Sequence, residues 1–186
     1  MDEEGSRAKD RFVPDVEAHV IDTNLFIKFE RADAVSLLER PVTAADAVLL
    51  VPPRVYAELT PAEAPYDRPP IDAAIAACWA RVIENVEYAD PVVSTTMDMI
   101  RRYIAVADDR PEHDIEQADG EVGGVAAQHL AKGDTVSVAV YTNDRAAFRG
   151  IDRALATHGY EDRLELVNAS EFFEAVQDRY DVETSR

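Results

Sequence analysis

The chain has 186 residues, of which 47% are hydrophobic, and its formal net charge is −18. This length suits one domain with a substantial core, and the single cysteine, Cys78, excludes an internal disulfide. No apolar run is long enough to span a membrane, and the acidic and polar start Met1-Asp2-Glu3-Glu4 does not have the form of a signal peptide. We therefore expect a cytoplasmic protein.

Hydrophobic periodicity predicts strands and helices that alternate along one domain at 18–182, preceded by a loose polar leader at 1–17. The strands are expected at 18–22, 47–51, 136–141 and 164–167. The helices are expected at 25–38 with a break near 32–33, at 54–59, 71–86, 92–106, 115–132 and 145–157, and from 170 onward. This alternation predicts right-handed crossovers and an α/β fold, a three-layer α/β/α sandwich with a central parallel sheet.

Local signals refine these boundaries. Four prolines in Pro61–Pro70 indicate a surface connection, and Gly133 suits the carboxyl-terminal cap of the preceding helix. Ser170 is a natural amino-terminal cap for the last helix. Cys78 lies beside Trp79 in an alanine-rich helical pattern, which predicts a reduced, buried cysteine.

Two acidic residues follow predicted buried strands directly. Asp22 ends the first strand in Asp22-Thr23-Asn24, and Asp144 follows a later strand in Thr142-Asn143-Asp144. For Asp22 a simple helix cap is the alternative. Because the carboxyl ends of parallel strands form the edge where ligands bind, we expect both carboxylates at one edge of the sheet.

Three further acids are candidates for the same edge. Glu58 lies in an otherwise apolar helix start, where partial burial requires a cation, hydrogen bonds or an ion pair with Arg54. Asp119 precedes a run of small residues that allows close helix packing, although a helix cap is the alternative. Glu121 could reach a metal from the same first turn. Glu116 competes with both, and the register of the small residues favours Asp119.

Gathered carboxylates repel one another, and divalent cations relieve that repulsion. Hard oxygen ligands favour Mg²⁺ or Mn²⁺, and a small number of carboxylates leaves coordination positions for water and phosphate. Such a centre suits hydrolysis of a phosphodiester bond.

Four short motifs, in order, resemble those of PIN-domain ribonucleases. They are Ile21-Asp22-Thr23-Asn24, Val55-Tyr56-Ala57-Glu58-Leu59, Asp119 with Val122 and the small residues that follow, and Tyr141-Thr142-Asn143-Asp144. The resemblance covers residues 18–170. It is weaker for the VapC-type toxins of the family, because the segment between Glu58 and Asp119 is long.

The resemblance implies a PIN-like fold and a role for each motif residue. Asp22, Glu58, Asp119 and Asp144 would be catalytic and would bind Mg²⁺ or Mn²⁺, and the substrate would be RNA. Thr23 or Thr142 would assist by hydrogen bonding, and Asn24 would hold the site in shape. Dimers are common among such relatives, so a homodimer is expected.

The charge composition affects whether RNA is a plausible substrate. Lysine occurs only three times, while acidic residues are spread along the whole chain, and this composition resembles proteins of salt-loving archaea. An acidic protein from an ordinary environment is the alternative. At molar salt the Debye length falls to about 3 Å, so the net charge does not exclude an RNA substrate.

Three functions are compatible with these patterns. The first is a metal-dependent endoribonuclease acting as the toxin of a toxin–antitoxin pair, with a small antitoxin protein as partner. The second is a nuclease of RNA processing or quality control, and the third is a non-catalytic module that binds RNA or protein. An adjacent gene for a DNA-binding antitoxin would favour the first. Several arginines could contact phosphate or pair with carboxylates instead, namely Arg101, Arg102, Arg145, Arg149 and Arg153.

Overall fold

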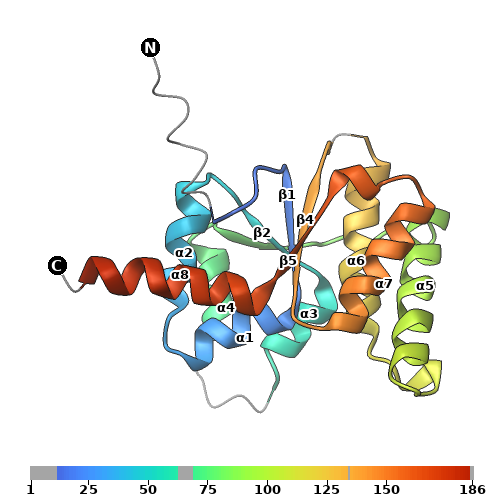
Figure 1. The fold of residues 1–186 in the computed structure, drawn as a ribbon, viewed down its shortest axis with the longest axis horizontal. Helices are drawn as coiled ribbons and strands as arrows, with labels where there is room; N and C mark the ends of the chain where they lie inside the picture. Colours follow the sequence, from blue (N-terminus) through green and yellow to red (C-terminus); the bar gives the residue numbers. More distant parts are fainter. Residues whose placement is uncertain (1–11, 63–68, 134, 185–186) are drawn as a thin grey trace.

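The computed structural model describes residues 12–62, 69–133 and 135–184, and Figure 1 shows their arrangement. Five parallel strands form one sheet in the order β3-β2-β1-β4-β5. Their bounds are β1 Ala18–Ile21, β2 Leu49–Val51, β3 Ala80–Val82, β4 Val138–Thr142 and β5 Leu164–Asn168. The central strands β1 and β4 are buried along their whole length, which explains their continuous apolar sequences.

Helices cover both faces of the sheet, so the predicted three-layer α/β/α sandwich is confirmed. Figure 1 shows α5, α6 and α7 on one side of the sheet and α1, α2 and α8 on the other. The bounds are α1 Thr23–Arg31, α2 Val35–Ala44, α3 Pro53–Leu59, α4 Pro70–Ala76, α5 Pro91–Ala107, α6 Gln117–Ala131, α7 Arg145–Thr157 and α8 Ala169–Thr184. No helix among the described residues is long and apolar enough to cross a membrane.

The sequence prediction is wrong between residues 71 and 86. Helix α4 ends at Ala76, and Cys78 has a positive φ of 66°, which turns the chain into the additional strand β3. Cys78 is therefore exposed, whereas Trp79 is buried and its ring packs against that of Phe26. The helical spacing of apolar residues arose because a short helix and a short strand both direct such residues into one core.

The ends of the described segments refine the other boundaries. Val13 is 2% exposed and belongs to the hydrophobic core, so packing begins within the segment predicted as a leader, whose residues 1–11 lie outside the described part. The surface connection predicted at Pro61–Pro70 also lies largely outside it. Gly133 has the positive φ expected after α6. The cap of α8 is Asn168, whose Oδ1 accepts from the backbone N–H groups of Ser170 and Glu171.

Glycines in α6 allow α5 to pack closely against it. A Cβ built on Gly123 would lie 2.1 Å from Cδ1 of Ile100 and 3.2 Å from Cγ1 of Ile151, and both of these isoleucines are fully buried. Since α6 carries Asp119 in its first turn, this contact fixes the position of a candidate site residue.

We predict that Gly123→Ala lowers the free energy of unfolding by about 1–2 kcal/mol, because the cost of overpacking exceeds the gain in helix propensity. Gly150→Ala in α7 is the matched control, since its Cβ would meet Ile100 at an ordinary 3.5 Å. Chemical denaturation measures both variants. Equal stability of the two would contradict the close-packing account.

Candidate functional site

The candidate site lies where the strand order of the sheet reverses. The chain runs outward from β1 through β2 to β3, returns to β4 beside β1, and continues outward to β5. Crossover helices leave this point toward opposite faces, and the resulting crevice at the carboxyl ends of the strands is a usual ligand position. Asp22 follows β1 and Asp144 follows β4, so both acids reach the crevice as predicted.

Asp22 is held rigidly in this crevice. It is only 5% exposed, and its backbone N–H donates to the carbonyl of Tyr141 on the neighbouring strand. Its Oδ1 accepts from the Thr23 N–H at 2.7 Å, while Oδ2 accepts from Asn24 Nδ2 at 3.1 Å and from Thr142 Oγ1 at 2.9 Å. Burial raises the pKa of Asp22, and the charge of Asp144 adds to this effect against the lowering by these hydrogen bonds.

Glu58 is brought to the site by the short helix α3, which begins directly after β2 at Pro53. The residue is exposed as a whole, and its Oε2 accepts a hydrogen bond from the Thr23 hydroxyl. Partial burial of its carboxylate raises its pKa, and the charges of Glu116, Asp22 and Glu121 raise it further. Thr23 therefore links two of the predicted acids, because its backbone N–H donates to Asp22 and its hydroxyl donates to Glu58.

Among the acids of the cluster, Asp119 has the pKa that is raised furthest. It is half-buried in the first turn of α6, and burial raises its pKa to about 7. The charges of Asp22, Asp144, Glu116 and Glu58 contribute to this increase in descending order. These acids come from four separate segments of the chain, so the fold concentrates negative charge at one edge of the sheet.

Asp144 has one carboxylate oxygen committed to structure. Its Oδ1 caps α7 by accepting from the backbone N–H groups of Ala146 and Ala147 at 2.6 and 2.9 Å. The N–H of Asp144 itself donates to Thr142 Oγ1, the hydroxyl that also binds Asp22. The cap alternative considered from the sequence is correct for Asp22, which precedes α1 as its cap, and wrong for Asp119, because Glu116 precedes α6. Asp144 is also a cap, and this role leaves its Oδ2 for another partner.

Two acids that competed with Asp119 in the sequence have different positions. Glu116 precedes α6 as an exposed residue, yet its charge raises the pKa of both Asp119 and Glu58, so it belongs to the same cluster. Glu121 is fully buried beside the cluster. The sequence analysis favoured Asp119 over Glu116 by the register of the small residues. That register does not show where α6 begins, and Glu116 is the residue directly before it.

Glu121 has both carboxylate oxygens bound by protein groups. Its Oε2 accepts from the Arg54 backbone N–H at 2.8 Å, and its Oε1 lies 3.4 Å from Arg54 Nε and accepts from the Tyr88 hydroxyl. Arg54 thus pairs with Glu121 and not with Glu58, the pairing considered from the sequence. This connection ties α3, which carries Glu58, to α6, which carries Asp119.

The Asn143 side chain binds the start of α8 and not a carboxylate of the cluster. Its Oδ1 accepts from the Ser170 N–H at 2.6 Å, so its side chain joins the end of β4 to the start of α8. The other three polar residues predicted to support the site, Thr23, Asn24 and Thr142, each donate directly to Asp22 or Glu58.

The chemistry of this cluster fits a divalent cation. No lysine, arginine or histidine of the described residues forms an ion pair with Asp22, Glu58, Asp119 or Asp144. Within the same described ranges, no group of three or more histidine, cysteine or acidic side chains is placed closely enough to hold a metal ion in this arrangement. Asp22, Glu58 and Asp144 lie close enough to Asp119 for their charges to raise its pKa, and hard oxygen donors of this kind suit Mg²⁺ or Mn²⁺.

The fold and the acidic edge define a class of protein, the α/β/α domains with a carboxylate cluster at the switch point of a parallel sheet. The model of the halobacterial PIN-domain family matches residues 15–181, so the chain belongs to this family. PIN domains are generally nucleases and typically use divalent metals. This membership confirms the predicted PIN-like fold and the halophilic archaeal origin. No curated protein and no solved structure matches the chain.

The buried position of Glu121 predicts that Arg54 stabilises the fold. Arg54→Met leaves a buried carboxylate without its cation, and we expect a loss of about 1–3 kcal/mol, reduced by the partial solvent exposure of Arg54. Arg102→Met is the control, because Arg102 lies in an exposed ion pair with Glu112. Urea denaturation at matched salt measures the stability of both variants. Equal stability of the two would contradict this role of Arg54.

The raised pKa of Asp119 predicts that Asp119→Asn stabilises the metal-free protein. A carboxyl whose pKa rises from 3.8 to about 7 on folding favours folding at low pH, and this contribution disappears as pH rises through 7. In EDTA at pH 8 the variant should therefore melt at a higher temperature than wild type, with the difference vanishing near pH 4.

The matched control for this experiment is Asp152→Asn, which removes one charge from an exposed position on α7. A similar gain in melting temperature from both variants would show that overall charge, and not the burial of Asp119 and repulsion within the cluster, causes the effect.

Proposed function

We propose that the protein is a metal-dependent endoribonuclease that hydrolyses RNA phosphodiester bonds at this acidic centre. The observation that carries the proposal is the meeting of four carboxylates at the switch point without any cationic side chain to compensate them. The choice of RNA as substrate rests on the resemblance of the four motifs to PIN-domain ribonucleases.

In this proposal Asp22, Glu58, Asp119 and Asp144 hold Mg²⁺ or Mn²⁺. When bound, such a cation acidifies a water molecule and stabilises the attacking and leaving oxygens during in-line displacement at phosphate. Glu121 was predicted from the sequence as a further ligand. It would reach the cation only by giving up Arg54 or Tyr88, so we assign it the positioning of α3 against α6.

Thr23, Thr142 and Asn24 orient the carboxylates of Asp22 and Glu58. Thr142 and Asn24 donate to Oδ2 of Asp22, which fixes the orientation of that carboxylate, and Thr23 does the same for Glu58. Because these donors are neutral, they orient the acids without cancelling their charge. The negative charge therefore stays available for a cation.

The presence of all four acids favours an active enzyme over a non-catalytic binding module. The role of the enzyme as a toxin or in RNA processing stays a prediction, as do the antitoxin partner, the homodimeric state and the cytoplasmic location.

Cleavage of a mixed RNA panel at molar KCl tests the proposal. We expect cutting by wild type with Mn²⁺ but not with EDTA, and a loss of about 10²-fold or more in Asp22→Asn and Asp119→Asn. Asp119→Asn is the sharper variant, because we predict that it is inactive while being more stable than wild type without metal. Asp152→Asn is the control that keeps full activity. Equal cleavage by wild type and both site variants would contradict the assignment.

A further inference from the structure

A hollow of about 370 Å³ opens beside the acidic cluster, on the side of α7. Asp144 forms part of its wall, and the hollow extends from there between α7, β5 and the start of α8. Its volume lies within the range of small-ligand sites. A molecule in this hollow would therefore be an immediate neighbour of whatever occupies the acidic centre.

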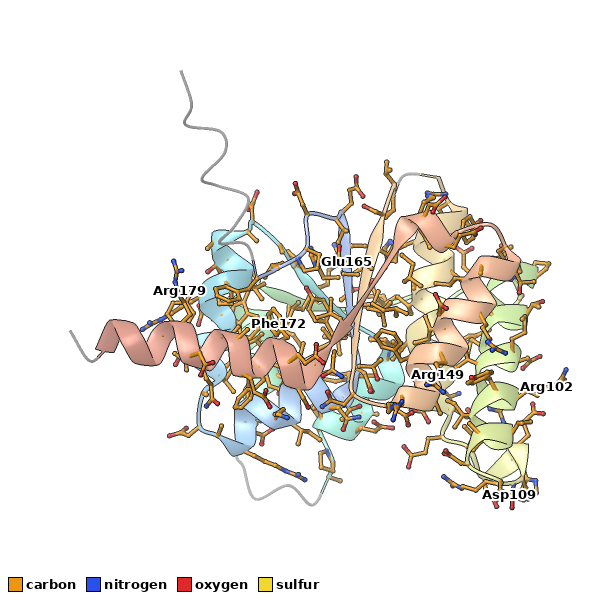
Figure 2. All side chains as sticks on the ribbon, viewed as in Figure 1. Arg102, Asp109, Arg149, Glu165, Phe172 and Arg179 are labelled. Atoms are coloured by element: carbon orange, nitrogen blue, oxygen red, sulfur yellow. The ribbon has the colours of Figure 1, made fainter. Side chains whose placement is uncertain are left out.

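Charged side chains of both signs line the hollow without pairing. Arg145 and Arg149 come from the first two turns of α7, and Glu171 comes from α8. All three are exposed, and none forms an ion pair with another described residue. Figure 2 shows Arg149 on the amino-terminal part of α7, the part that follows β4. Their donors and acceptors therefore remain for a ligand.

Phe148 supplies an aromatic surface in the same hollow. Its side chain is half-buried but lies outside the hydrophobic core, and its ring stacks on no other aromatic ring of the described residues. Other phenylalanines nearby, such as Phe172, pack into the core through ring contacts. A partly exposed ring at the wall of a polar hollow suits stacking against a nucleobase.

Two asparagines on the wall have defined orientations. The Oδ1 atoms of Asn143 and Asn168 both accept from the Ser170 N–H, and that of Asn168 accepts from the Glu171 N–H as well. Since a backbone N–H can only donate, the Nδ2 groups are fixed as donors. The hollow thus combines fixed amide donors, the Glu171 carboxylate as acceptor, and two guanidinium groups.

We infer that this hollow is the subsite for the nucleotide next to the scissile phosphate, which deepens and rests on the proposed nuclease function. Phe148 stacks against the base, and the asparagine amides with Glu171 contact the edge of the base. Arg145 and Arg149 contact its phosphate. At molar salt, long-range attraction of RNA is screened, so contact-range stacking and hydrogen bonds of this kind must hold the strand.

Binding of the four nucleoside 5′-monophosphates in EDTA and molar KCl tests the subsite without requiring catalysis. We expect saturable binding, followed by amide NMR shifts, that weakens roughly tenfold in Phe148→Ala and about fivefold in Arg149→Ala. Arg153→Ala is the control on the same helix, because Arg153 packs over the Tyr103 ring, and it should bind normally. Melting curves verify that each variant is folded.

Cleavage of RNA oligonucleotides with one randomised position on either side of the cut provides the second readout. Phe148→Ala and Glu171→Gln should alter base preference at one position beside the cut, whereas Arg149→Ala should reduce kcat/KM for all sequences alike. Normal cleavage by these variants, with no monophosphate binding by wild type, would overturn the subsite and leave the nuclease intact. Monophosphate binding that depends on Phe148, without any RNA cleavage, would overturn the nuclease function and keep the subsite.

Discussion

Repulsion among carboxylates at the switch point between β1 and β4 is the constraint on which the other features of the site depend. Each acid alone has an ordinary structural role, since Asp22 and Asp144 cap helices and Glu58 accepts from a threonine. Burial raises the pKa of Asp119 to about 7, and the charges of these three acids and of Glu116 contribute to the rise, which is a cost to the metal-free fold. Such destabilisation of the metal-free fold is tolerated where a bound cation relieves it, and the protein then has lower stability without metal but a functional site.

The scaffold around the cluster consists of contacts that keep the acids from moving apart. The glycines of α6 let this helix pack closely on α5, and Glu121 binds Arg54 and Tyr88 to fix α6 against α3. These contacts lie behind the acids and do not neutralise them. The position of Asp119 is thus set by packing and by the ion pair of the buried Glu121 with the half-exposed Arg54, and neither contact neutralises the charge of Asp119.

The sequence predicted the fold class and the meeting of four acids, because buried parallel strands and the acids that follow them leave strong local patterns. It failed at 71–86, where a helix and strand β3 share one apolar spacing and the positive φ of Cys78 leaves no signal. The sequence also did not predict which side chains contact one another around the site. Arg54 binds Glu121 and not Glu58, and Glu116 joins the cluster, because such choices depend on how α3 and α6 approach each other.

Paramagnetic broadening of amide NMR signals by Mn²⁺ at molar KCl tests the central claim directly, because the chain offers 37 acidic residues as competing sites. The account predicts that trace Mn²⁺ broadens the signals of residues beside Asp22, Glu58, Asp119 and Asp144 first, and that Asp119→Asn abolishes this selectivity. Broadening spread evenly over the acidic surface, or its absence at the end of β1 and β4, would contradict a cation centre at this edge.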